Sequence, residues 1–417
     1  MKRRNRLLLF TLIFTLVFST TVLAAATTPP ELIGKAAISV DMDTNEIIYT
    51  KNIDNKMQPA SITKLLTGLL LAENKKSTDN LVYTESAKKQ PAFSYNLNLH
   101  PVTIGDTMSA DNVMDALLLY SGNDIASMVA DNVAGDTEKF AKLMNEKAVS
   151  LGMKGSHFVT PNGLDDVTKE HYTTAYDLTL LGRAVYKNDW VKKTIAKKTS
   201  VIKFSNGPQV TVENRNKLLG IDGNVGGKTG VTNKSGRCLV SIYERNGRKI
   251  IGVVMDSEYD AKDTKVFEDM TSLINYSYAA QKEVLKKKNT AIKTISVPYK
   301  VIPFIGPKRT ISVPLESKED ITYYNNDLKP KNIVDVSSVN PWKLDKDTSV
   351  GTMSITQKDS NKSYKLYPMI SKSTLIKDNI IIYVAAAVVL IIIIALILFL
   401  ISSINKRKNR HGRRIRY

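Results

Sequence analysis

The chain has 417 residues, of which 43% are hydrophobic and 24% charged, and its formal net charge is +19 at pH 7. This length is sufficient for two or three domains, and the composition is that of a globular chain rather than a disordered one. Four lysine or arginine residues lie in residues 1–6 and seven in residues 402–417, with no acid in either segment. More than half of the net positive charge therefore lies at the two ends of the chain, a pattern typical of residues that flank membrane segments. No nucleic-acid partner is predicted.

The two ends of the chain have the patterns of targeting and anchoring segments. Residues 1–26 combine a basic start, a short apolar stretch and small residues, as in a secretory signal peptide. Residues 380–401 are apolar almost throughout and long enough to cross a bilayer core of about 30 Å as a helix. The basic residues 402–417 favour a cytoplasmic tail. We therefore expect a single-pass protein of the cell membrane whose body lies on the extracytoplasmic face.

Between these ends, strands flank a helical region. Residues 36–49 have the pattern of a β-hairpin, and strands return from Val201, with Asn246-Gly247 as a strong hairpin signal. Amphipathic helices are predicted between them, over residues 109–120, 136–151 and 173–187. This order predicts an α+β domain over residues 31–282, with an antiparallel sheet and a helical cluster packed on it.

Two further stretches complete the predicted organisation. Residues 282–288 are rich in lysine and indicate a solvated helix end or a linker. Residues 290–372 carry short apolar runs broken by proline and glycine, which predicts a small β-rich domain without catalytic residues, a spacer before the membrane. Cys238 is the single cysteine and lies in an apolar run, so we expect a buried thiol and no intramolecular disulfide.

Ser61 and Lys64 lie three residues apart at the start of an apolar helical run. Residues at this spacing share a helix face, so the lysine amine can reach the serine hydroxyl. A serine becomes a good nucleophile when a neighbouring base takes its proton, and a lysine acts as that base when burial or nearby positive charge lowers its pKa. The spacing alone is common in helices that begin with a capping serine, so it does not identify an active site.

Two later motifs change this interpretation. Ser121-Gly122-Asn123 interrupts the helical region, and Lys228-Thr229-Gly230 lies between predicted strands. In this order the three motifs resemble those of penicillin-binding proteins and serine β-lactamases. The flanks at residues 59–67, 144–148 and 161–165 sharpen the resemblance to the low-molecular-mass D-alanyl-D-alanine carboxypeptidases. The resemblance covers roughly residues 31–280 and implies the penicillin-recognising fold.

The resemblance implies catalytic roles for four side chains. Ser61 would be the nucleophile and Lys64 its general base. Lys228 would be a second cation, which disfavours protonation of Lys64. Ser121 would relay a proton between the two lysines and the leaving amine.

The same resemblance implies a set of substrate contacts. Lys228 and Thr229 would bind the terminal carboxylate of the substrate, and Asn123 its peptide backbone. The backbone N–H groups of Ser61 and Val231 would form an oxyanion hole.

The implied reaction removes the terminal D-alanine from peptidoglycan stem pentapeptides through an acyl-enzyme on Ser61. β-Lactams are expected as covalent inhibitors of the same serine, and the cytoplasmic membrane as the other partner. No cofactor or metal is predicted, because the four histidines show neither metal-ligand spacing nor the context of a Ser-His-Asp triad.

Other functions remain open at this point. A β-lactamase, or an endopeptidase or transpeptidase acting on D-Ala-D-Ala bonds, would use the same motifs, and a catalytically silent wall-binding protein could keep the fold. A phosphate-binding loop around Lys228 is excluded, because that pattern needs glycine at position 222, which is aspartate. No buried strand is expected before Lys228.

Overall fold

A computed structural model describes residues 28–91, 99, 102–164, 169–207, 209–303 and 305–412. The predicted signal peptide, residues 1–26, lies outside the described residues. The chain divides into two units. The first extends to Lys282 and includes the returning segment Tyr324–Leu328, and the second comprises Glu283–Tyr323 and the residues from Lys329 onward.

The first unit is built on an antiparallel sheet that, within the described residues, has five strands in the order β2-β1-β9-β8-β7. The predicted hairpin at Asn246-Gly247 is confirmed, since both residues have positive φ (51° and 77°), as a tight turn between twisted strands requires. The strands are β1 (Ala36–Asp41), β2 (Ile47–Lys51), β7 (Asn224–Thr232), β8 (Gly236–Arg245) and β9 (Arg248–Ser257).

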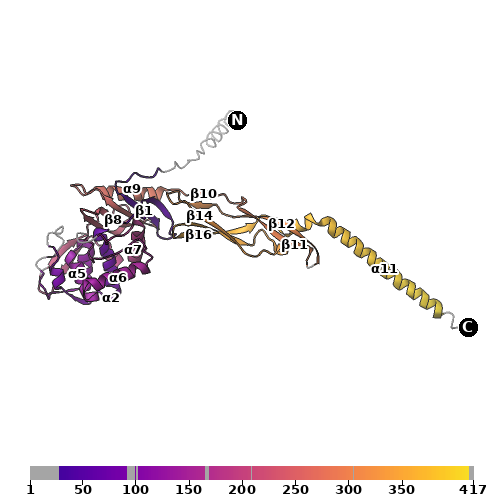
Figure 1. Cartoon of the computed structure of the whole chain (residues 1–417), viewed down its shortest axis with the longest axis horizontal. Coiled ribbons are helices and arrows are strands. Elements are labelled where there is room, and N and C mark those ends of the chain that lie inside the picture. The colour runs from indigo at the N-terminus through magenta and orange to yellow at the C-terminus, as the bar shows by residue number, and fades with distance from the viewer. Residues whose placement is uncertain are drawn as a thin grey trace, which may run out of the picture. The chain divides into compact units, whose positions relative to one another are not determined.

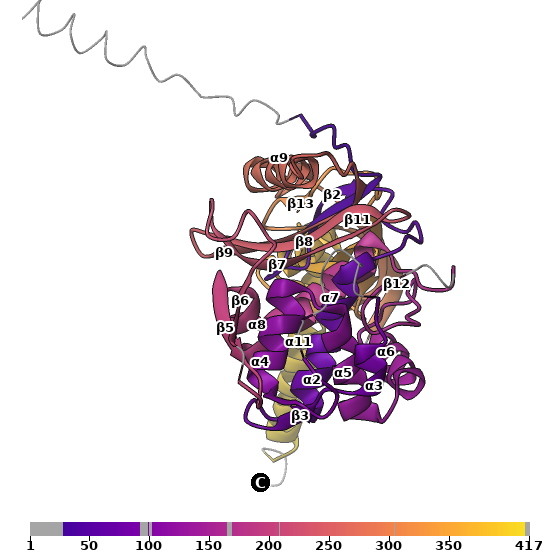
Figure 2. The same cartoon turned by 90° about the vertical axis from the view of Figure 1, so that its left-hand side faces the viewer.

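Helices cover both faces of this sheet (Figure 2). On one face, α9 (Lys265–Ala279) packs against β8 and β9, and on the other α7 (Ala175–Lys187) packs against β1 and β9. Successive residues of β9 point to opposite faces, so Val253 joins the core beneath α7 and Val254 the core beneath α9. The predicted α+β fold is confirmed, although the sequence analysis did not identify α9.

The helical cluster lies on the α7 side of the sheet (Figure 1, indigo to magenta). Side chains cap the starts of two of its helices: Ser109 accepts from the backbone N–H of Asn112, and Asp136 from that of Lys139. The cluster contains the single turn η1 (Ala60–Thr63), then α2 (Lys64–Asn74), α3 (Glu85–Lys88), α4 (Ala110–Asp115), η2 (Ala116–Tyr120), α5 (Asn123–Ala134), α6 (Thr137–Ser150) and α8 (Asp189–Ile195). Two short strand pairs border it, β3 (Asn80–Val82) with β4 (Thr107–Ser109) and β5 (Thr199–Lys203) with β6 (Gln209–Glu213).

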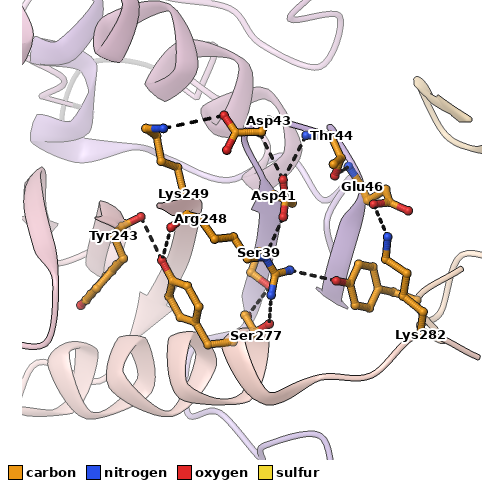
Figure 3. A network of polar contacts seen from close by, with 12 residues as sticks. Ser39, Asp41, Asp43, Thr44, Glu46, Tyr243, Arg248, Lys249, Ser277 and Lys282 are labelled. Atoms are coloured by element: carbon orange, nitrogen blue, oxygen red, sulfur yellow. Dashed lines mark hydrogen bonds and ion pairs between the residues drawn. The ribbon is translucent and has the colours of Figure 1, made fainter. Parts of the chain in front are cut away.

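A network of hydrogen bonds and ion pairs joins several segments of the chain on the α9 face of the first unit (Figure 3). The guanidinium of Arg248 donates to Asp41 at 2.8 Å and to the hydroxyl of Tyr324 at 2.9 Å, and Lys282 lies 2.6 Å from Glu46. Tyr324 belongs to the returning segment, so this network joins β1, β9 and a stretch of chain that is distant in sequence. The site described below lies on another part of the unit.

One expectation about β7 is wrong. Lys228 is preceded by strand residues, because β7 begins at Asn224. Gly226 and Gly227 make this strand difficult to predict from residue propensities, since glycine is depleted in strands. A side chain at Gly227 would collide with the backbone carbonyl of Val240 on β8, so the close pairing of the two strands requires glycine there.

The second unit is β-rich, as predicted. Its main sheet has the order β11-β12-β16-β15-β14. The linker expected at residues 282–288 instead contains β10 (Glu283–Lys286), whose partner β13 (Ile321–Tyr323) is too distant in sequence to be recognised from it. The remaining elements are β11 (Lys293–Ile302), β12 (Ile305–Glu316), β14 (Lys331–Val336), η3 (Pro341–Lys343), β15 (Gly351–Gln357), β16 (Ser360–Pro368), α10 (Lys372–Asp378) and α11 (Ile380–Gly412).

The apolar segment near the C-terminus forms α11. Its stretch Ile380–Arg407 is, among the described residues, the one helix long and apolar enough to cross a membrane. Ile382 and Tyr383 pack against the core of the second unit, whereas the apolar residues that follow are exposed. α11 is therefore a candidate membrane anchor.

Candidate active site

Ser61 and Lys64 lie at the junction of η1 and α2. Ala60 has a φ of 47°, a left-handed conformation that turns the chain into this helical start. The amine of Lys64 lies 2.8 Å from the hydroxyl of Ser61, as the spacing predicted. Such contact is what a serine and a base need for proton transfer.

Lys64 is held by two further oxygen atoms. Its amine donates to Oδ1 of Asn123 at 2.7 Å and to the backbone carbonyl of Asn162 at 3.0 Å. The side chain is fully buried, and this burial lowers the pKa of Lys64 to about 7, although the charge of Asp124 acts in the opposite direction. A lysine with this pKa is neutral in a large fraction of molecules at neutral pH and can accept a proton.

Lys228 and Ser121 form a second amine–hydroxyl pair. The amine of Lys228 donates to the hydroxyl of Ser121 at 2.9 Å, and the lysine side chain is buried. The pKa of Lys228 lies well below its usual value, because of burial first and then of three nearby cations, Lys64, Arg237 and Arg215. The site thus contains two buried lysines, each in contact with one serine hydroxyl.

The backbone around Ser121 has an unusual geometry. η2 is a single wide helical turn, and Ser121 follows it with a φ of 75°. Wide turns and left-handed non-glycine residues are uncommon, and both occur frequently at functional sites. Together they end one helix and start α5 at Asn123, which places the Ser121 hydroxyl beside Lys228.

Gly230 brings β7 against the start of the Ser61 helix. A Cβ atom at Gly230 would lie 2.9 Å from the carbonyl oxygen of Pro59 and 3.0 Å from the backbone nitrogen of Ser61. These distances leave no room for a side chain. The close approach positions the backbone of β7 near the N–H of Ser61, where an oxyanion hole would need it.

A cleft of about 650 Å³ opens in front of these residues. This volume suits a small peptide or drug-sized ligand. The predicted site residues that line it are Ser61, Ser121, Thr229 and Val231, with Gly230 between the last two. The other three, Lys64, Asn123 and Lys228, are buried behind this surface. All seven predicted residues are therefore brought together, in two layers.

Two arginines of the cleft were not predicted from the sequence. Arg215 lines the cleft and lies over the ring of Tyr120, with 5.3 Å between the guanidinium carbon and the ring centroid. Arg237 also lines it, and donates to Asp263 at 2.8 Å. Arg237 is opposite Val231 in the ladder of β7 and β8, so only the strand register could have revealed it.

His171 lies behind the helix of Ser61 and also escaped the sequence analysis. Its Nε2 is 2.9 Å from the hydroxyl of Thr63, and its Nδ1 accepts from the backbone N–H groups of Val159 and Thr160. Burial lowers the pKa of His171 to about 4. The side chain is therefore neutral near pH 7 and structural in position, since it does not touch Ser61.

Comparison with known proteins places the chain in a family. A family model described as D-alanyl-D-alanine carboxypeptidase matches residues 23–259. The D-alanyl-D-alanine carboxypeptidase DacF of Bacillus subtilis is 26% identical over 72% of this chain and 76% of its own length. A D-alanyl-D-alanine endopeptidase of Pseudomonas aeruginosa is 31% identical over 61% of this chain and 83% of its own length.

A solved structure extends the likeness in fold to most of the chain. The D-alanyl-D-alanine carboxypeptidase DacD of Francisella tularensis superimposes with a TM-score of 0.62, covers 85% of this chain and 97% of its own, and is 23% identical. The chain therefore belongs to the D-alanyl-D-alanine carboxypeptidase family, the low-molecular-mass penicillin-binding proteins, and is a serine carboxypeptidase by that membership.

Proposed function

We propose that the chain removes the terminal D-alanine from peptidoglycan stem pentapeptides through an acyl-enzyme on Ser61. The observation that carries this proposal is the pair of buried lysines, Lys64 in contact with Ser61 and Lys228 in contact with Ser121, behind two serines that line one cleft. Two lysines of lowered pKa beside two hydroxyls provide both a base and a route for returning the proton.

In the proposed acylation step, neutral Lys64 accepts the proton of Ser61 while its Oγ attacks the carbonyl carbon of the penultimate D-alanine. The negative charge on the carbonyl oxygen is stabilised by the backbone N–H groups of Ser61 and Val231. The proton then passes through Ser121 to the amine of the leaving D-alanine as the C–N bond breaks. One proton moves from the serine to the product, and Ser61 is left as an ester.

In the proposed deacylation step, water attacks the ester carbon and Lys64 again accepts a proton. The bond between the carbonyl carbon and Oγ breaks, Ser61 regains its proton, and the shortened peptide leaves. β-Lactams would follow the first step, since their amide carbonyl occupies the same position and their ring opens when Oγ attacks. The second step would be slow for them, so the adduct would persist.

Substrate recognition is proposed for residues of both layers of the site. The hydroxyl of Thr229 and the charge of Lys228 would hold the terminal carboxylate of the peptide. Asn123 keeps its proposed contact with the peptide backbone through the amide nitrogen, while its Oδ1 holds Lys64 in place.

We also propose the placement of the chain in the cell envelope. Residues 1–26 would be removed as a signal peptide, residues 31–282 would form the catalytic domain, and residues 290–372 a spacer. Residues 380–401 would cross the cytoplasmic membrane and residues 402–417 would lie in the cytoplasm. The apolar length of α11 and the basic residues after it support this topology.

A second candidate activity is cleavage of cross-linked stem peptides, because a relative that matches over 83% of its own length is named an endopeptidase. The test is product analysis by mass spectrometry with two substrates, a monomeric pentapeptide and a cross-linked peptide dimer. Release of free D-alanine from the monomer supports the carboxypeptidase. Conversion of the dimer to monomers without D-alanine release supports the endopeptidase.

A further inference from the structure

The hairpin formed by β11 and β12 ends beside the first turns of α11 (Figure 1). Asn379, just before α11, donates to the hydroxyl of Tyr299 at 2.8 Å and accepts from Arg309 at 2.8 Å. One helical turn later, the hydroxyl of Tyr383 donates to the backbone carbonyl of Val301 at 2.6 Å. The helix start is thus fixed to both strands of the hairpin.

These contacts show that the helix and β11 advance in the same direction. From Asn379 to Tyr383 the helix rises by about 6 Å, and from Tyr299 to Val301 the strand rises by about 6.6 Å. The match means that the hairpin continues alongside the helix beyond Tyr383. Ile302, the next residue of β11, therefore lies about level with Ala385, roughly 8 Å along the helix from its first residue.

The end of the hairpin exposes apolar side chains where the strands behind it are buried. Val301 is fully buried, whereas Ile302 is 39% exposed and its ladder partner Ile305 is 71% exposed. Neither isoleucine belongs to the hydrophobic core of the second unit. Exposed isoleucines gathered on a projecting hairpin are unfavourable in water, so a cover is expected for them.

Cationic side chains lie next to this apolar pair, on the side further from the tip of the hairpin. Lys300 and Lys308 are opposite each other in the ladder, and Arg309 follows. Two like charges directly opposite in a strand pair are destabilising on their own. Beside anionic lipid headgroups they become favourable, and apolar residues next to lysines with long stems are typical of a membrane interface.

We propose that Ile302 and Ile305 insert into the interface of the bilayer that α11 crosses, with Lys300 and Lys308 at the level of anionic headgroups. This inference rests on the proposed membrane span. The depth fits, since the pair lies about 8 Å below the start of α11 and interfacial segments bury their apolar side chains by about 5–10 Å. The second unit would then contact the bilayer at two points, the helix and the hairpin, which restrains its orientation on the membrane.

The test uses the full chain in vesicles of phosphatidylcholine and phosphatidylglycerol. A polarity-sensitive fluorophore is attached at Ile305→Cys, with Ile302→Cys as a second variant at the same place. Thr294→Cys, exposed near the other end of β11, is the matched control for water, and Ile391→Cys, in the middle of α11, is the control for the span. The parent chain serves as the blank, because burial raises the pKa of its Cys238 thiol to about 12.

The readout is quenching by lipids that carry a nitroxide just below the headgroup and, for the control at position 391, by lipids that carry it deep in the acyl chain. We expect a blue shift and loss of most of the emission at positions 305 and 302, and neither at position 294. If position 391 is quenched but 305 and 302 behave like 294, the span stands and the hairpin inference is overturned. A blue shift at 305 without quenching would indicate that protein covers the isoleucines and would also overturn it. If position 391 is not quenched, the membrane span itself is wrong.

Discussion

The hydroxyl of Thr63 lies 2.9 Å from Nε2 of His171, and this contact joins the helix of Ser61 to the loop that carries Asn162. Because Nδ1 of His171 accepts from two backbone N–H groups, Nε2 carries the proton and donates to Thr63. The loop in turn offers the carbonyl of Asn162 to the amine of Lys64. We infer from this chain of contacts that His171 helps to position the base, although it does not contact Ser61 or Lys64.

Replacing His171 should separate its structural and positioning effects. His171→Ala leaves two partly buried N–H groups without their acceptor, at a cost of up to about 1–3 kcal/mol each, and should lower the free energy of unfolding accordingly. His171→Asn can restore an acceptor near the position of Nδ1 but cannot reach Thr63. We expect it to recover most of the stability while acylation by penicillin remains slower than in the parent. Equal acylation by the Asn variant and the parent would contradict a positioning role.

The stability of the protein should fall in mild acid through the same histidine. The pKa of His171 is about 4 in the folded chain against 6.5 as its ordinary value, so the unfolded state binds more protons in between. The contribution is fully present above pH 6.5 and is lost as the pH falls towards 4, in total on the order of 3 kcal/mol. Urea unfolding between these pH values measures it. His171→Asn should show a shallower slope, and an unchanged slope would exclude His171 as the cause.

The rate of acylation should follow the ionisation of Lys64. Because its pKa is about 7 and the neutral amine is the proposed base, the rate should rise about tenfold per pH unit below 7 and level off above it. Stopped-flow measurement with a chromogenic β-lactam gives this profile. Asp124→Asn removes a charge that raises the pKa of Lys64, so the rise should shift to lower pH. A rate that still increases beyond pH 9 would indicate an ordinary lysine and contradict the assignment.

Gly230→Ala should impair acylation more than folding. The added methyl group would press on Pro59 and on the backbone nitrogen of Ser61, which moves β7 away from the proposed oxyanion hole. Loss of one such donor slows acyl transfer by about 100-fold or more. Gly247→Asn is the control, since it lies in a remote hairpin where asparagine tolerates positive φ. Similar acylation by both variants would show that Gly230 does not control the position of this strand.

Arg215 should contribute to recognition of anionic substrates. It lines the cleft, and Arg237, the other arginine there, is paired with Asp263. Arg215→Met should lower kcat/KM about tenfold for a peptide ending in a carboxylate, and much less for the same peptide ending in an amide. Lys192→Met is the matched control, because Lys192 also lies over a tyrosine ring, that of Tyr186, but does not line the cleft. Equal losses with both peptides would rule out recognition of the carboxylate by Arg215.

The parts of the site that depend on short spacings were predictable. Ser61 and Lys64 are one helical turn apart, so their contact follows from the chain itself, and the order of the three motifs indicated which residues would join them. The contacts of the buried residues behind the cleft surface were harder to predict from the sequence. The resemblance implied a substrate contact for Asn123 but did not indicate that its Oδ1 accepts from Lys64, a contact that arises because a buried amine requires acceptors on several sides.

The unpredicted features share a dependence on contacts between distant segments. Arg237 is part of the cleft because β8 pairs with β7 in one register, and β10 is a strand because β13 lies beside it. α9 covers one face of the sheet. Along each strand the apolar residues alternate between this face and the opposite one, so the local pattern alone did not reveal that each face has its own hydrophobic core. Such features follow from the assembled sheet rather than from any single stretch of sequence.

The most direct test of the central claim is the intact mass of the full chain after incubation with benzylpenicillin, followed by peptide mapping. The account predicts one adduct of the mass of the antibiotic, located on the peptide that contains Ser61. It should be lost in Ser61→Ala and retained in Ser150→Ala, a control at an exposed helix end. An adduct that persists in Ser61→Ala, or no adduct on the parent chain, would contradict the assignment of Ser61 as the nucleophile.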